Sequence, residues 1–148
     1  MNEQPASRGA TTGPSVARVV ARADVTGVVL AGGQGRRMGG VDKGLVDFAG
    51  SPMVAHVIGR LAPQVGAMLI NANQNADRYA SFGYPVVADA IGGFAGPLAG
   101  LHAGLCAATT THVVTSSCDS PFLPLDLVAR LGAALATADA ELAVARTG

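Results

Sequence analysis

Glycine, arginine and lysine gather in one stretch of the sequence, from Leu30 to Lys43, which reads LAGGQGRRMGGVDK. Five of its positions are glycine, and because glycine has no Cβ, backbone N–H groups can converge there on an anion. Two arginines and a lysine add positive charge to the same stretch. A glycine-rich turn after a buried strand is a common phosphate-binding device of α/β proteins. The stretch therefore predicts a phosphate-binding loop.

The loop departs from two well-known phosphate-binding motifs. The dinucleotide fingerprint G-x-G-x-x-G begins correctly at Gly33 and Gly35 but has Met38 in place of its third glycine. The P-loop pattern needs a lysine where Val41 stands, and the lysine comes later, at Lys43. A mobile surface loop without function is the alternative, but such loops seldom carry this combination of arginine, methionine, aspartate and lysine. The sequence favours a phosphate site of another kind.

The elements that must position this loop follow from the apolar pattern. Five apolar runs predict buried strands, over residues 25–30, 67–70, 85–88, 112–117 and 141–145. Four segments predict helices, the first from Ser51 as N-cap with Pro52 at the first helical position, and the others over residues 76–81, 98–108 and 124–137. Strands that alternate with helices predict an α/β fold of three layers, a mostly parallel twisted sheet with helices on both faces.

Polar residues follow the ends of several predicted strands. The glycine loop, Asn71, Asp89 and Asp119 all come just past a carboxyl end. In an open parallel sheet these ends share one edge, where ligands bind. Four segments that are far apart in the sequence are therefore expected to meet in one crevice.

The residue types at this edge indicate phosphate chemistry. Lys43 and the loop amides suit anionic oxygens, whereas a lone carboxylate such as Asp119 would repel phosphate unless a Mg²⁺ ion bridges them. Asp89 suits the metal or a ribose hydroxyl, and Asn71 suits a base or a sugar. The alternatives are a turn-forming or capping Asp119, a structural Asn71 and a solvated Lys43. With no general base in view, the set favours phosphoryl or nucleotidyl transfer.

Composition limits the class of protein. The chain has 148 residues, 49% of them hydrophobic and 14% charged, with a formal net charge of zero. One domain with an ample core fits this length, and the absence of a basic excess argues against a nucleic-acid partner. No apolar run reaches the roughly 18–20 residues that a membrane span needs, so no membrane partner is expected.

The cysteines and the first residues complete this picture. Cys106 and Cys118 form no disulfide framework, and both are expected to be reduced in a cytoplasmic protein. Residues 1–23 lack the continuous apolar core of a secretory signal. We predict a disordered tail over 1–23 and one nucleotide-binding domain over 24–148.

The sequence resembles the molybdenum cofactor guanylyltransferases, which belong to the sugar-nucleotidyltransferase-like NTP transferases. The pattern L-A-G-G-x-G-x-R-M-G-G-x-D-K-G-L, from Leu30 to Leu45, is similar to the signature of that family. Four later segments are similar to family motifs in order and spacing: residues 71–73 (NAN), Asp89, residues 96–100 (GPLAG) and residues 118–121 (CDSP). The resemblance extends over residues 25–145, nearly everything outside the tail.

The resemblance implies a Rossmann-like nucleotidyltransferase fold and a specific reaction. The terminal phosphate of molybdopterin cofactor attacks the α-phosphorus of Mg-GTP, pyrophosphate leaves, and the guanine dinucleotide cofactor forms. Carried over by position, Lys43 would neutralise the phosphates, Asp119 would hold Mg²⁺, and Arg37 would assist catalysis. The resemblance also implies cofactor-delivery or molybdoenzyme-maturation proteins as partners. The nucleotide-binding residues would be Leu30, Ala31, Gly32, Gly33, Lys43, Asn71, Asp89 and Gly100.

Several alternatives stay open at the level of sequence. Members of the family continue beyond the position of Gly148, so we expect the carboxyl-terminal part of the fold, with much of the acceptor side, to be missing. Gly32-Gly33 resembles the guanylyl enzymes, whereas cytidylyl relatives tend to have Ala-Gly there. A sugar-phosphate relative or a nucleotide-binding module without turnover also fits. Met38 and Asn71 argue against a Rossmann oxidoreductase.

Overall fold

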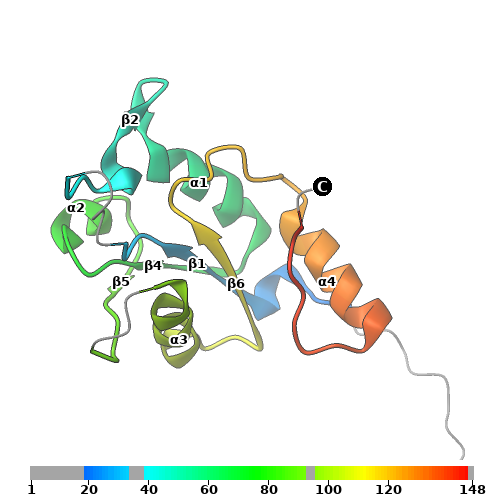
Figure 1. Ribbon diagram of the computed structural model, residues 1–148. Coiled ribbons are helices and arrows are strands. Elements are labelled where there is room, and N and C mark those ends of the chain that lie inside the picture. The colour runs from blue at the N-terminus through cyan, green and yellow to red at the C-terminus, as the bar shows by residue number, and fades with distance from the viewer. Residues whose placement is uncertain (1–18, 34–38, 93–95, 147–148) are drawn as a thin grey trace, which may run out of the picture.

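The computed structural model describes residues 19–33, 39–92 and 96–146. Its centre is a four-stranded sheet in the order β5-β4-β1-β6 (Figure 1), in which every neighbouring pair is parallel. The predicted parallel α/β architecture is therefore confirmed. The strands are β1 (Val25–Leu30), β4 (Ala67–Asn71), β5 (Val86–Val87) and β6 (His112–Ser117).

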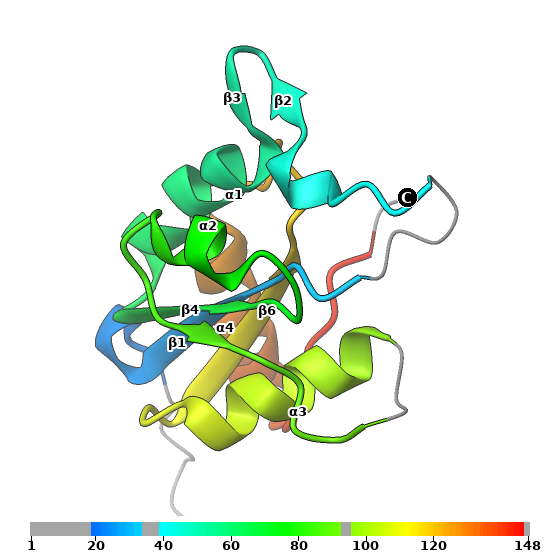
Figure 2. The same ribbon diagram turned by 90° about the vertical axis from the view of Figure 1, so that its left-hand side faces the viewer.

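Helices lie on both faces of this sheet, as predicted. Figure 2 shows α1 and α2 on one side and α3 on the other. A two-stranded hairpin, β2 (Asp47–Phe48) with β3 (Ser51–Pro52), projects before α1. Short 3-10 helices span Arg22–Asp24, Lys43–Leu45 and Ala62–Gln64. The helices are α1 (Met53–Leu61), α2 (Ala76–Ala80), α3 (Pro97–Ala107) and α4 (Leu127–Ala138).

The two faces of β1 are packed in different ways. On one face, the branched side chains of Val54, Val57 and Leu61 in α1 are fully buried in the main hydrophobic cluster. On the other, α3 presents a buried face of alanine and glycine. A Cβ at Gly104 would lie 2.8 Å from a methyl group of Val28. The small residues of α3 therefore allow its backbone to approach the sheet closely.

The predicted start of the first helix is wrong. Ser51 and Pro52 pair with Phe48 and Asp47 as strand β3, and α1 begins at Met53 without a side-chain cap. The reason is the turn between the strands, where Ala49 and Gly50 both have positive φ angles, 51° and 85°. Two successive residues of this kind favour a tight hairpin, and the hairpin uses the residues that had suggested a cap.

The predicted fifth strand, over residues 141–145, is also wrong. After α4 the chain reverses at Asp139, whose φ is 47°, and residues 141–146 have no regular structure. Leu142 and Val144 are 75% and 78% exposed. A strand needs a hydrogen-bonded neighbour, and no strand in the described part of the chain pairs with this segment.

The packed domain begins earlier than the sequence predicted. Val20 already packs against the core, and a Cβ at Gly132 of α4 would lie 3.0 Å from its Cβ. The packed domain therefore includes residues before Asp24, within the segment that was predicted to be a tail. Among the described residues, every helix is too short or too polar to cross a membrane.

Candidate functional site

The register of the sheet brings the predicted site residues to one edge. Leu30 at the end of β1 is paired with Asn71 of β4 and with Ser117 of β6, and Asn71 is paired with Val87 of β5. Backbone hydrogen bonds continue this alignment past the strands, from Ala31 N to Asn71 O at 2.8 Å and from Cys118 N to Leu30 O at 3.1 Å. The segments after β1, β4, β5 and β6 therefore meet, as the sequence predicted.

One half of this edge is a hydrogen-bonded cluster of Asn71, Asn73 and Asp89, which we call the Asn71–Asp89 network. The amide nitrogen of Asn71 donates to Asp89 Oδ1 at 2.8 Å and to the carbonyl of Val87 at 3.2 Å. The amide nitrogen of Asn73 donates to Asp89 Oδ2 at 2.8 Å, and the backbone N–H of Asp89 donates back to Asn73 Oδ1 at 2.8 Å. Protein amides thus bind both oxygens of the Asp89 carboxylate.

Burial explains why the Asn71 amide is bonded within the protein. Asn71 is only 2% exposed, and a buried polar group without a partner is costly. Its side chain acts mainly on other protein groups. Sequence analysis singled out Asn71 and Asp89 but missed Asn73 as their partner. The signal was available in the alternation of Asn71 and Asn73, because residues two apart in an extended segment lie on the same side.

Two glycines give the network its space. A Cβ at Gly100 would collide with Asn71 Oδ1 and lie 2.9 Å from Leu30 Cδ2. A Cβ at Gly32 would lie 3.0 Å from both Asn71 Oδ1 and Asn73 Nδ2. Glycine at these two positions therefore has a packing reason in addition to any contact with a ligand. Gly33, by contrast, is exposed, and no atom of the described residues lies within 4 Å of its Cβ position.

The other half of the edge is an open ion pair, the Lys43–Asp119 pair. Lys43 Nζ lies 3.8 Å from Asp119 Oδ2, and the two side chains are 49% and 39% exposed. The hydroxyl of Ser117 donates a hydrogen bond to Asp119 Oδ1. An exposed ion pair of this kind contributes about 0–1 kcal/mol because water screens it. Both charges are therefore available to a ligand at little energetic cost.

Cys118, the residue before Asp119, is packed in the hydrophobic core. It is 8% exposed, and burial, followed by the charges of Asp119 and Asp42, raises the pKa of its thiol to about 11. The thiol is therefore protonated at neutral pH, which is the form expected of a small packed residue rather than a nucleophile.

Asp42, immediately before Lys43, is a polar residue of the edge that sequence analysis did not single out. Its carboxylate accepts hydrogen bonds from the hydroxyl of Tyr79 and from the amide of Asn75, the latter at 2.9 Å. The available signal was its place beside the lysine in the loop. Arg37 was assigned to this pocket by resemblance, and it lies outside the described residues.

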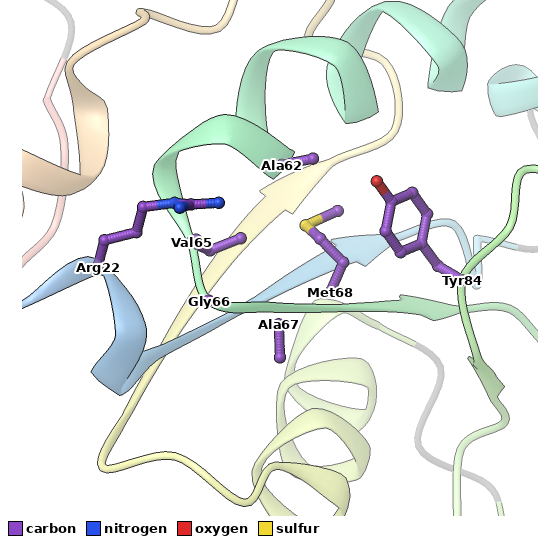
Figure 3. A pocket seen from close by; sticks show the side chains of 7 residues that line it. All are labelled: Arg22, Ala62, Val65, Gly66, Ala67, Met68 and Tyr84. Carbon is purple, nitrogen blue, oxygen red and sulfur yellow. The ribbon is translucent and has the colours of Figure 1, made fainter.

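A pocket at the opposite end of the sheet shows none of these features. It is lined by Arg22, Ala62, Tyr84 and the segment from Val65 to Met68, which runs into the start of β4 (Figure 3). Arg22 is the only charged residue in this lining, and none of the predicted site residues belongs to it. In the described part of the chain, no group of three or more His, Cys, Asp or Glu side chains is arranged to hold a metal ion.

A family model and a curated relative both match this chain and point to the same kind of protein. The family model described as "MobA-like NTP transferase domain" matches residues 27–148. A molybdenum cofactor guanylyltransferase of Ralstonia nicotianae is 57% identical over 126 residues, which cover 85% of this chain and 62% of the relative. The chain thus spans less than two thirds of the length of this curated relative.

Solved structures show the same fold. A homologue, from Mycobacterium sp. strain JC1, of a Mycobacterium tuberculosis protein has a TM-score of 0.63 and 25% identity, covering 78% of this chain and 61% of that one. Molybdopterin-guanine dinucleotide biosynthesis protein A from Archaeoglobus fulgidus has a TM-score of 0.57 and 24% identity, covering 72% and 53%. Both agree with a parallel sheet covered by helices on its two faces.

Proposed function

The chain belongs to the family of MobA-like NTP transferase domains, and on that basis we propose that it transfers GMP from Mg-GTP to molybdopterin cofactor. An oxygen of the terminal phosphate of the cofactor attacks the α-phosphorus of GTP and forms a new P–O bond. The bond from the α-phosphorus to the oxygen that bridges to the β-phosphate breaks, and pyrophosphate leaves with the electron pair. The name of the Ralstonia nicotianae relative, molybdenum cofactor guanylyltransferase, supports this choice of reaction.

The Lys43–Asp119 pair is the observation that carries the proposal. It places one accessible cation and one accessible carboxylate 3.8 Å apart, at the edge where the segment after β1 begins. A triphosphate needs positive charge along its oxygens, and Lys43 supplies it directly. Because the pair is weak in water, phosphates can displace the carboxylate from the lysine without a large loss of stability.

The residues of the glycine loop have matching roles. In this proposal Leu30, Ala31, Gly32 and Gly33 contact the nucleotide through their backbone, which the small side chain of Ala31 and the two glycines leave accessible. Arg37 adds positive charge to the same phosphates.

The Asn71–Asp89 network supports the nucleotide from the other half of the edge. Asn71 is buried, so it acts by holding the half-buried Asp89 carboxylate in place. Asp89 still has lone pairs for a sugar hydroxyl. Gly100 makes room for the side chain of Asn71, and by this means it shapes the nucleotide site.

The donor set at Asp119 fits a Mg²⁺ ion that is shared with the substrate. Mg²⁺ is usually held by one or two carboxylates together with phosphate oxygens and water. Asp119 offers one carboxylate that is 39% exposed, and Ser117 fixes one of its oxygens by a hydrogen bond. In this proposal Asp119 would hold Mg²⁺, which supplies positive charge against the phosphates when bound.

Nucleotide preference is the first test. Titration calorimetry of this chain with GTP, CTP, ATP and NAD, each with and without Mg²⁺, is expected to show Mg²⁺-dependent preference for GTP. Preference for CTP would replace the guanylyl assignment with a cytidylyl one. Preference for NAD would contradict the transferase assignment altogether.

Turnover is the second test, because binding does not require it. The chain is incubated with Mg-GTP and molybdopterin cofactor, and pyrophosphate is measured. The proposal expects pyrophosphate release that depends on the cofactor. GTP binding without release would instead identify a nucleotide-binding module. A GTP-dependent reaction also suits a cytoplasmic location and partners that deliver the cofactor or mature molybdoenzymes.

A further inference from the structure

The side chain of Asp42 ties the segment before Lys43 to helix α2. Its two carboxylate oxygens accept hydrogen bonds from Tyr79 and from Asn75, one to each oxygen. Asn75 immediately precedes α2, and Tyr79 is a fully buried residue of that helix. Hydrogen bonds to an ionised carboxylate are stronger than those between neutral groups. The helix contains none of the predicted site residues, yet it holds the residue next to the site lysine.

The backbone of Asp42 is fixed as well. Its carbonyl accepts a hydrogen bond from Leu45 N at 3.1 Å, and the carbonyl of Lys43 accepts one from Val46 N at 3.2 Å. These bonds form the 3-10 turn Lys43–Leu45. Both the main chain and the side chain of Asp42 are therefore hydrogen-bonded directly before Lys43.

The Lys43–Leu45 turn also packs between Tyr79 of α2 and Cys118, which follows β6. A Cβ at Gly44 would lie 2.5 Å from the hydroxyl oxygen of Tyr79 and 3.1 Å from Cys118 Cβ. Cys118 is followed by Asp119, the partner of Lys43. The same contacts therefore set the lysine and the carboxylate relative to each other.

A lysine needs such support because its side chain is flexible. Lysine loses much rotamer freedom when it is held in one position, and an exposed ion pair does little to hold it. Burial, and then the hydrogen bond to Asp42, raise the pKa of Tyr79 well above its usual value. Tyr79 is thus protonated, and remains a donor, throughout the neutral range.

We propose that Asp42, held by Tyr79 and Asn75, is a positioning residue that fixes Lys43 for the phosphates of the bound nucleotide. This inference rests on the proposed function for the identity of that ligand. In this inference helix α2, through Tyr79, orients the charge of Lys43, which lies outside the helix.

The test compares Tyr79→Phe with Tyr84→Phe, a matched variant in the pocket at the far end of the sheet (Figure 3). Titration calorimetry with Mg-GTP is expected to show about fivefold weaker binding for Tyr79→Phe, because one of two hydrogen bonds to Asp42 is lost. Affinity for guanosine, which has no phosphates, stays at the wild-type value. Tyr84→Phe matches wild type for both compounds.

A double variant separates positioning from a general structural effect. When Lys43 is already replaced by alanine, Tyr79→Phe is expected to cause no further loss of affinity for Mg-GTP. The same fivefold loss in that background, or an equal loss for guanosine, would overturn the inference. If Tyr79→Phe does not fold, Asn75→Gly removes the other donor at an exposed position whose φ of 53° suits glycine, and it is judged by the same criteria.

Nuclear magnetic resonance without nucleotide makes the inference independent of the proposed function. The backbone amide resonances of Lys43 and Asp119 are expected to shift in Tyr79→Phe and Asn75→Gly but not in Tyr84→Phe. Unchanged resonances at both residues would refute the positioning role. If the wild-type chain binds no GTP, the proposed function fails, and these resonances alone decide the inference.

Discussion

The Asn71–Asp89 network and the Lys43–Asp119 pair occupy the same edge of the sheet, but protein amides hold both carboxylate oxygens in the first, whereas the second is a long, exposed ion pair. In the network, two amide side chains bind both oxygens of Asp89 at 2.8 Å. In the pair, the two charges are 3.8 Å apart and both side chains are more than a third exposed.

Burial accounts for this difference. Asn71 is 2% exposed, and a buried amide must have its partners within the protein. Lys43 and Asp119 are exposed to solvent, so neither charge needs a partner within the protein. The comparison suggests that the network carries stability and shape, whereas the pair carries ligand binding. Each of the following variants tests one side of that division.

Replacement of Asn71 by alanine is expected to have the largest effect on stability. It removes a donor from Asp89 and from the carbonyl of Val87 and leaves a gap in a buried site, so the free energy of unfolding should fall by about 3 kcal/mol. Urea denaturation followed by circular dichroism measures this change. Asn73→Ala is the exposed control and should lose about 1 kcal/mol. Equal losses would mean that burial does not distinguish the two amides.

Gly100→Ala tests the space that the network needs. The added Cβ meets the oxygen of Asn71 and Leu30 Cδ2, and overpacking of this kind should lower the free energy of unfolding by about 2 kcal/mol. Gly33→Ala, whose added Cβ meets no described atom within 4 Å, should change the free energy of unfolding by less than about 0.5 kcal/mol. The same urea titration applies, and an unaffected Gly100→Ala variant would show that the network adapts without strain.

Lys43→Ala tests whether the Lys43–Asp119 pair binds the phosphates of the nucleotide. Loss of the cation should weaken GTP about tenfold, equivalent to about 1.4 kcal/mol, while guanosine binding should stay unchanged because it has no phosphates. Titration calorimetry with both compounds measures the difference. A similar loss for guanosine would place Lys43 against the nucleoside instead.

The smallest effect is expected when the Lys43–Asp119 pair is removed and stability is measured. Lys43→Ala and Asp119→Ala should each change the free energy of unfolding by less than about 0.5 kcal/mol, because the pair is exposed. Urea denaturation of both variants beside Asn71→Ala provides the measurement. A loss as large as that of Asn71→Ala would remove the distinction between the two halves.

Much of this arrangement follows from sequence. The apolar runs predicted β1 and β6 with their observed ends, and alternation of strands and helices predicted a parallel sheet. From there, the meeting of Asn71, Asp89 and Asp119 at one edge required no further information, because the carboxyl ends of parallel strands lie together.

Other features depend on contacts that sequence spacing does not encode. The pairing of Asn73 with Asp89 and of Tyr79 with Asp42 joins residues 16 and 37 positions apart. The hairpin at Ala49 and Gly50 places Ser51 and Pro52 in strand β3 instead of at the predicted start of a helix. Residues 141–145 have the composition of a strand, but pairing requires a neighbour, which composition cannot supply.

The most direct measurement is the affinity for GTP, with and without Mg²⁺, of the wild-type chain and of Asp119→Ala. If the open pair holds the phosphates together with a metal ion, Mg²⁺ will strengthen GTP binding to the wild-type chain, and Asp119→Ala will bind GTP equally with and without the ion. A variant that keeps the full Mg²⁺ dependence of wild type would contradict the assignment of the metal to Asp119 and of the ligand to this half of the edge.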